Sequence, residues 1–219
     1  MNRSAVVEME DFEALLSRTA MADGEPLSAL DRALIQTGLA ASLPCLDQGA
    51  IQTGIGRALA QGATPAQIQE VISVVAGLGV HSLMASATTL IEASRQAGFD
   101  LEGPLSEEEA RLWDKRVGTD PFWDAMETEL PGFLKAMLRL SPAQFEAFFD
   151  FCAVPWKTRA VPARVKELLA LASDAMAAHR FLPGFRLHLA NAIQLGAGRI
   201  MVRECLQLAA EAPPHRGIA

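Results

Sequence analysis

The chain has 219 residues, a formal net charge of −7 at pH 7 and a hydrophobic fraction of 50%. These values indicate a folded globular protein and exclude a largely disordered one. Lys and Arg never cluster beyond a pair, so the chain lacks the basic patch that nucleic-acid binding requires, and we expect no nucleic-acid partner.

Alanine and leucine recur at helical spacing in the first half, and no stretch alternates apolar and polar residues as a half-buried strand does. This pattern predicts an all-α fold. Thr64 and Gln67 flank Pro65 as a capping box, and Gly98 is expected to end a helix. The predicted helices cover residues 9–21, 28–42, 44–62, 65–78 and 82–97.

The N-terminus carries acids where a signal peptide needs an apolar core. We expect no uncharged run of membrane-spanning length in the rest of the chain, and therefore predict a soluble, cytoplasmic protein with no membrane partner. The three cysteines are odd in number and far apart in the sequence, which argues against a disulfide framework and indicates free thiols.

Residues 99–160 are richer in acids and aromatic residues and contain all three tryptophans. Ser106, Pro121, Pro131 and Pro142 each mark the start of a predicted short helix. Because these helices carry apolar faces, we interpret the segment as a packed helical bridge and not as a flexible linker.

The densest group of chemically versatile side chains lies in residues 179–196. His179 and His188 flank the dipeptide Pro183-Gly184, which predicts a turn that opens a helix. Gly196 is expected to end that helix. The turn would place His188 in the first part of one helix and His179 beyond the end of the preceding one.

Shifting the sequence by 134 positions aligns residues 25–81 with 159–215 without a gap and places helix ends at the same points. We therefore predict an internal repeat: a first copy at 1–98, the bridge at 99–160 and a second copy at 161–219 that lacks the final helix of the first. Identical pairs include Leu34/Leu168, Ala58/Ala192, Gly62/Gly196, Ala63/Ala197, Glu70/Glu204 and His81/His215.

Several segments resemble the carboxymuconolactone decarboxylase family, and the similarity covers nearly the whole chain. They are Pro121-Phe122-Trp123-Asp124-Ala125, the stretch from Phe148 to Trp156, Val165-Lys166-Glu167-Leu168-Leu169, Pro183-Gly184-Phe185-Arg186-Leu187-His188, and the first-copy stretches 62–71 and 77–81. The resemblance implies two helical repeats of the alkyl hydroperoxidase D-like fold and a homo-oligomer, either a dimer or a trimer. Because members of this family have several activities, the resemblance implies less about function than about fold.

The resemblance also bears on the candidate site, because His81, His179, His188 and His215 stand where tandem members of this family commonly carry histidine. Glu167 lies on the helix before the turn, and a helical hairpin could bring it to His179 and His188. A carboxylate beside imidazoles suits general acid/base chemistry near neutral pH. The alternative is that His188 packs in the core and Glu167 pairs with Lys166 or Arg164 on the surface.

Arg186 and Arg180 are candidates to bind a substrate carboxylate, although a solvated arginine near a helix start is an equally simple interpretation of Arg180. A metal could in principle use Glu167, His179 and His188, but their spacing matches no metal motif, so we expect no metal and no organic cofactor.

In the first copy, Ala33, Cys45 and Gly54 replace Glu167, His179 and His188, so only the second copy keeps the candidate chemistry. The peroxidase branch of the family needs a Cys-x-x-Cys pair, which this sequence lacks. Cys45 could therefore act as a peroxidase thiol only with a thiol from another chain.

These observations lead to a functional hypothesis. The chain resembles a lyase that acts on a small carboxylated lactone or carbonyl acid by decarboxylation or isomerisation. His188 would be the acid/base, Glu167 and His179 would orient it, and Arg186, His215 and His81 would contact the substrate. The alternative is a non-catalytic helical binding or assembly protein of the same fold, and a further one is an alkyl hydroperoxidase-type peroxidase.

Overall fold

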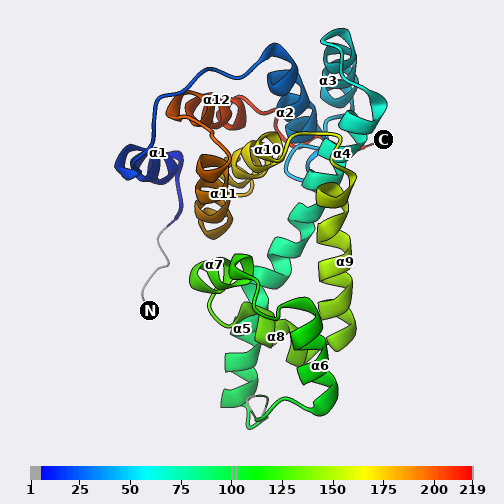
Figure 1. The fold of residues 1–219 in the computed structure, drawn as a ribbon, viewed down its shortest axis with the longest axis vertical. Helices are drawn as coiled ribbons and strands as arrows, with labels where there is room; N and C mark the ends of the chain where they lie inside the picture. Colours follow the sequence, from blue (N-terminus) through cyan, green and yellow to red (C-terminus); the bar gives the residue numbers. More distant parts are fainter. Residues whose placement is uncertain (1–5, 100, 102, 219) are drawn as a thin grey trace. The chain divides into compact units, whose positions relative to one another are not determined.

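The computed structural model describes residues 6–99, 101 and 103–218, and within these ranges the regular structure is helical, with no strand (Figure 1). The predicted all-α fold is therefore confirmed. The chain packs as two units. Unit 1 comprises residues 1–78 and 155–219, and unit 2 comprises residues 79–154.

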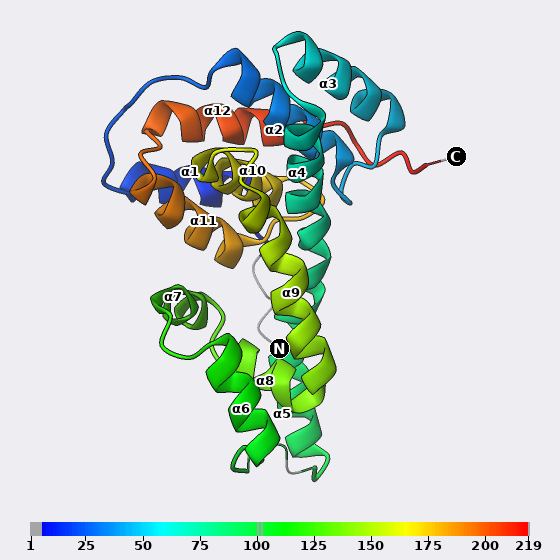
Figure 2. The same cartoon turned by 45° about the vertical axis from the view of Figure 1, so that its right-hand side comes forward.

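Unit 1 is organised around one helix, α10, in which every residue from Val165 to Ala175 is buried. Figures 1 and 2 show α10 between α11 on one side and α2 and α4 on the other. The helices of this unit are α1 (Met9–Arg18), α2 (Ala29–Ala41), α3 (Gln48–Ala60), α4 (Pro65–Ala76), α10 (Ala163–Ala175), α11 (Leu182–Gln194) and α12 (Arg199–Ala210).

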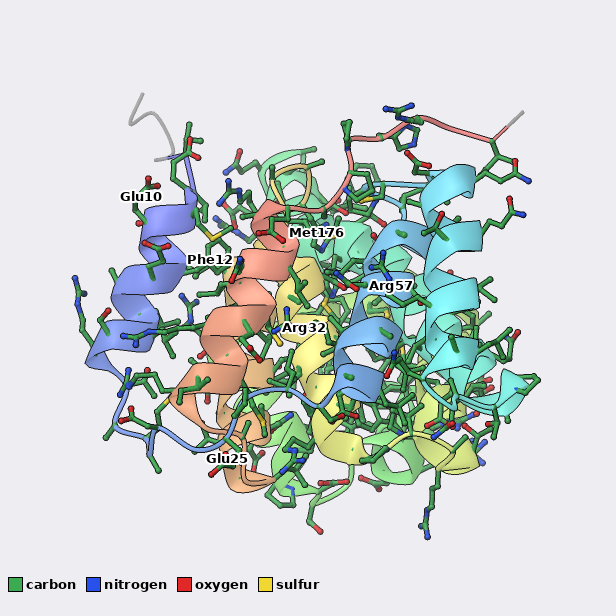
Figure 3. All side chains as sticks on the ribbon, turned by 90° about the horizontal axis from the view of Figure 1, so that it is seen from above. Glu10, Phe12, Glu25, Arg32, Arg57 and Met176 are labelled. Atoms are coloured by element: carbon green, nitrogen blue, oxygen red, sulfur yellow. The ribbon has the colours of Figure 1, made fainter. Side chains whose placement is uncertain are left out.

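Helix α1 is attached to the C-terminal helices of unit 1. Its Phe12, labelled in Figure 3, packs edge-on against Phe185 of α11 with ring centroids 4.8 Å apart. Arg199 at the start of α12 donates to the carbonyl oxygens of Leu16 (2.7 Å) and Thr19 (2.9 Å). The guanidinium thus binds carbonyl oxygens at the C-terminal end of α1, where the helix itself supplies few donors.

Unit 2 has an aromatic core. Phe148 packs against Phe133 and Phe149 with ring centroids 5.7 and 5.2 Å apart, in the edge-to-face geometry that aromatic rings prefer. The packed character expected for residues 99–160 is thus present. The elements here are η1 (Gly77–Val80), which begins in unit 1, α5 (His81–Gln96), α6 (Glu107–Arg116), α7 (Pro121–Glu129), α8 (Phe133–Leu140) and α9 (Pro142–Thr158), which ends in unit 1. Helix α5, assigned from the sequence to the first repeat, belongs to unit 2.

Local signals place most helix ends correctly. The capping box of Thr64 and Gln67 starts α4, and Gly98 follows α5 with φ of +89°. Two helix starts that were predicted from prolines are wrong. Pro44 lies in a turn and α3 begins at Gln48, because Leu46 has a φ of +39° that a helix cannot accommodate. Pro131 also lies in a turn, and α8 begins after Gly132, which has a φ of +79°.

The expectation that no uncharged run reaches membrane-spanning length is also wrong. Residues 71–91 contain no Asp, Glu, Lys or Arg, and the helical stretch Pro65–Gln96 is long and apolar enough to cross a membrane. Core helices of soluble proteins meet the same criterion, and Val71, Val75 and Leu78 of this stretch are buried in the core of unit 1. The stretch is therefore weak evidence for a membrane span.

The two halves of unit 1 share the same helix boundaries at an offset of 134 residues. Helices α2, α3 and α4 correspond residue for residue to α10, α11 and α12. Positive φ angles also recur at equivalent positions. Leu46 and Arg180 have φ of 39° and 50°, and Gly62 and Gly196 have φ of 89° and 84°.

Two glutamates connect these halves reciprocally. Glu70 of α4 accepts hydrogen bonds from Lys166 Nζ (2.6 Å) and from the backbone N–H of Val161 (3.1 Å) before α10. Glu204 of α12 accepts from Arg32 (2.5 Å) and from the N–H of Leu27 (2.7 Å) before α2. Figure 3 labels Arg32 on α2. Glu70 thus attaches α4 to the start of α10, and Glu204 attaches α12 to the start of α2, the helix equivalent to α10.

The first of these connections is far more buried than the second. The side chains of Lys166 and Glu70 are 2% and 1% exposed, whereas those of Arg32 and Glu204 are 35% and 21% exposed. Burial alone would raise the pKa of Glu70, but the hydrogen bonds from Lys166, Thr158 and the backbone lower it below the ordinary value. Its contribution to stability is therefore present above the ordinary pKa and is lost as the pH falls.

This contrast in burial predicts unequal effects of the same change. Lys166→Met leaves the Glu70 carboxylate buried without its cation and should lower the free energy of unfolding by about 3 kcal/mol. Arg32→Met, the matched control, should cost about 1 kcal/mol or less because water reaches Glu204. Urea denaturation followed by circular dichroism measures both, and equal losses would contradict the assignment of Lys166 as the dominant connection.

Candidate active site

A hairpin of two helices brings together an acid and an imidazole. Helices α10 and α11 are joined by the turn at residues 176–181, and Glu167 near the start of α10 faces His188 in the middle of α11. His188 Nδ1 lies 2.6 Å from Glu167 Oε2. Asn191, one helical turn after His188, donates its amide to the second oxygen of Glu167 at 3.3 Å. Both carboxylate oxygens of Glu167 are therefore engaged.

The Glu167 contact sets the chemistry of His188. With Nδ1 directed at a carboxylate, Nδ1 carries a proton and Nε2 is left to exchange a proton with another molecule. Burial alone would lower the pKa of His188, but the hydrogen bond and charge of Glu167, together with the charge of Asp174, raise it overall. The protonated imidazole thus persists to a higher pH than an ordinary histidine would allow.

Sequence reasoning missed a second acid, Asp174, two turns after Glu167 on the same face of α10. Its side chain is fully buried, and Oδ1 lies 3.5 Å from His179 Nε2. Burial raises the pKa of Asp174, while the hydrogen bond of His179 and the charges of His188 and His179 oppose this. The available signal was an acid within the apolar stretch Leu168–Ala175, where an unpartnered carboxylate is costly.

Gly184 provides the space for that acid. A Cβ at this position would lie 2.5 Å from Asp174 Oδ2 and 2.8 Å from the ring of Phe181, so only glycine allows the first turn of α11 to approach the carboxyl group this closely. The glycine predicted from the sequence as part of a turn therefore also has a packing role.

A pocket of about 360 Å³ adjoins the outer end of this group of residues. Its walls are mainly apolar, and two imidazoles face it, one from the turn after α10 and one from the C-terminal segment. The lining residues are Leu43, Pro44, Leu78, Ala178, His179 and His215. Because His179 contacts both the pocket and Asp174, ionisable groups extend from the pocket to Glu167. We refer to Glu167, Asp174, His179 and His188 as the acid–histidine cluster.

The structure therefore brings together some of the predicted site residues and separates others. Glu167 and His188 are in direct contact, and His179 joins them through Asp174. His215 is at the pocket. The surface salt bridges considered for Glu167 are absent from the described residues, because Lys166 binds Glu70 and Glu167 is 7% exposed.

Arg186 and Arg180 do not join this cluster. Arg186 precedes His188 by two positions, and residues so spaced do not share a helix face. Arg180 is directed toward α1, with its guanidinium 3.8 Å from Glu8 and 6.0 Å from the ring centroid of Phe12, which favours the structural interpretation of Arg180. His81 is the first residue of α5, in unit 2.

All three cysteines are free, as predicted. Burial raises the pKa of Cys45, whose thiol donates to the carbonyl oxygen of Pro213 at 2.9 Å. Burial also raises the pKa of Cys152 to about 11 and the pKa of Cys205. Since the thiolate is the nucleophile in thiol peroxidases, none of these environments favours that chemistry.

Comparison with known proteins identifies a relative. The chain is similar to a crystal structure of a putative gamma-carboxymuconolactone decarboxylase subunit from Burkholderia xenovorans LB400, with 30% sequence identity and a TM-score of 0.71. The similarity covers 84% of this chain and 71% of that chain. A scan with family models gave no match, and neither did a search of curated proteins.

The contact between Glu167 and His188 predicts a shift in titration. Glu167→Gln removes the negative charge that stabilises the imidazolium, so the pKa of His188 should fall. Nuclear magnetic resonance of the imidazole protons measures it. Glu211→Gln, at the exposed end of α12, is the matched control and should leave the His188 midpoint in place. An unmoved midpoint in Glu167→Gln would show that the carboxylate does not control His188.

The packing of Gly184 against Asp174 predicts a stability difference between two helical glycines. Gly184→Ala should destabilise unit 1 by about 1–3 kcal/mol, because the new methyl group overlaps Asp174. Gly56→Ala on α3, where nothing lies within 4 Å of the added carbon, should stabilise it by about 0.5–1 kcal/mol. Thermal unfolding of the two variants gives the comparison, and a neutral Gly184→Ala would rule out the close approach.

Proposed function

The chain belongs to the carboxymuconolactone decarboxylase family, and we propose that it is a lyase that needs no organic cofactor and acts on a small carboxylated lactone or carbonyl acid. The observation that carries the proposal is the partly buried contact between Glu167 and His188, 2.6 Å long, within the acid–histidine cluster that adjoins the pocket. Such a cluster beside an apolar pocket is the arrangement that general acid/base catalysis requires.

In the proposed reaction the carbon–carbon bond to the substrate carboxylate breaks, CO₂ leaves, and the bonding electron pair remains as an enolate. Protonated His188 is the acid that supplies the proton for the carbanion carbon, and it is then reprotonated from water. Glu167 holds the ring through Nδ1 and stabilises its positive charge. His179, held by Asp174, and His215 face the substrate, and Arg186 and His81 are further candidates to contact it. The same groups would serve an isomerisation.

The energetics of burial support an enzyme over a non-catalytic binding or assembly protein of the same fold. Burying Glu167 and Asp174 costs free energy that a scaffold can avoid. The equivalent positions in the first half are Ala33 and Ala40, which pack in the same helical frame without that cost. Retention of two buried acids in one half alone is therefore best explained by chemistry.

Three further features belong to this proposal. The first is a tandem repeat, supported by the helix boundaries that recur at an offset of 134 residues in unit 1. The second is a homo-oligomer, a dimer or trimer, supported by the description of the similar structure as a subunit and by the exposed Phe151 and Val154 of α9. The third is a cytoplasmic location.

The test is a purified-protein assay with carboxymuconolactone as substrate. The wild type should release CO₂, and His188→Gln should lower kcat by roughly 10²- to 10⁴-fold, because the proton donor is lost. Glu167→Gln should also lower kcat and shift the pH–rate profile to lower pH, whereas Glu211→Gln should behave as the wild type. Absence of CO₂ release, or an unchanged kcat in His188→Gln, would refute the proposed function.

A further inference from the structure

The C-terminal segment after α12, residues 211–218, returns to the turn at residues 42–47 in the first half of unit 1. Cys45 contacts it twice: its thiol donates to the carbonyl oxygen of Pro213 at 2.9 Å, and its own carbonyl oxygen accepts from the N–H of Arg216 at 3.1 Å. Arg216 Nε also lies 3.2 Å from Asp47 Oδ2. The segment is therefore held on both sides of His215.

The groups that hold this segment are themselves fixed. Asp47 is the N-cap of α3, and its Oδ1 accepts from the N–H of Ala50 at 2.9 Å. Cys45 has no exposed surface. A carboxylate fixed at a helix start and a buried thiol provide rigid partners, so the position of His215 is set by contacts distant from it in sequence.

The pocket combines two imidazoles with apolar walls. His179 and His215 come from different segments, and no Lys, Arg, Asp or Glu is among the lining residues. An imidazole N–H donates a hydrogen bond to an oxygen of a ligand, and a protonated ring adds positive charge. Asp174 Oδ1 lies 3.5 Å from His179 Nε2, and this contact orients the ring. When the acid is neutral it donates to Nε2 and leaves the proton on Nδ1.

We propose that this pocket binds a small organic carboxylate between His179 and His215, and that the C-terminal segment completes the pocket by supplying His215. A volume of about 360 Å³ suits a ligand with one ring. The proposal rests on the proposed function, since it names the group by which that site recognises its substrate. Each imidazole contacts a carboxylate oxygen, and Leu43, Pro44 and Leu78 surround the apolar body.

The test measures binding without chemistry, by isothermal titration with benzoate and with benzyl alcohol, which has the same ring and no charge. The wild type should bind benzoate more tightly than benzyl alcohol. His215→Ala should weaken benzoate binding by about tenfold or more, through the lost charge-assisted hydrogen bond, and leave benzyl alcohol binding nearly unchanged. Arg57→Ala, which removes an exposed cation on α3, is the matched control and should bind benzoate as the wild type does.

A second variant, with residues 213–219 deleted, removes the segment while leaving α12 intact. It should show the same selective loss of benzoate binding, with an unchanged circular dichroism spectrum as the check on folding. Equal affinities of the wild type for the two ligands, or benzoate binding unaffected by His215→Ala, would overturn the proposal.

The outcomes separate this proposal from the proposed function. Selective benzoate binding that depends on His215, in a protein with no lyase activity, would support the carboxylate pocket and refute the lyase. Lyase activity that depends on His188, with benzoate binding unaffected by His215→Ala, would refute the pocket and support the lyase.

Discussion

The structure of unit 1 depends on one constraint: α10 is buried on all sides and yet carries Lys166, Glu167 and Asp174. Counted over the whole residue, these three are 2%, 5% and 0% exposed. A buried ionisable group without a partner costs several kcal/mol, so each must meet a complementary group from a neighbouring element. Lys166 contacts Glu70 from α4, and Glu167 contacts His188 from α11. Asp174 contacts His179 from the turn that joins α10 to α11. The polar residues of α10 thereby determine which elements surround it.

One of these three pairs connects the two halves of unit 1, and the other two form the candidate site. The pair of Lys166 and Glu70 has a counterpart in Arg32 and Glu204, so the connection between halves is present twice. The acid–histidine cluster has no counterpart, because Ala33 and Ala40 occupy the positions of Glu167 and Asp174. Because the helix boundaries recur in both halves, the cluster can occupy one half while the other half carries different residues at the same positions. The position of His179 is then filled by Cys45, which holds the C-terminal segment.

Whether a feature could be predicted from the sequence depends on how far apart its interacting residues lie along the chain. Helix ends depend on contacts within a few residues, so the capping box at Thr64 and the glycine at Gly98 were informative, whereas prolines marked two starts early. The contact of Glu167 with His188 was predictable because a short turn joins their helices. Asp174 was missed because a buried acid leaves no periodic signal, and the packing of α5 in unit 2 and the return of the C-terminal segment to Cys45 depend on tertiary contacts.

The surroundings of the two acid–histidine pairs shift the pKa values of Asp174 and His188. Burial raises the pKa of Asp174, which favours a neutral carboxyl group, while Glu167 raises the pKa of His188, which favours an imidazolium. The two pKa values are coupled, because the charge of Asp174 raises the pKa of His188 and the charge of His188 opposes the rise in the pKa of Asp174. Coupled groups of this kind titrate as a unit, so the cluster and not a single residue sets the proton supply near the pocket.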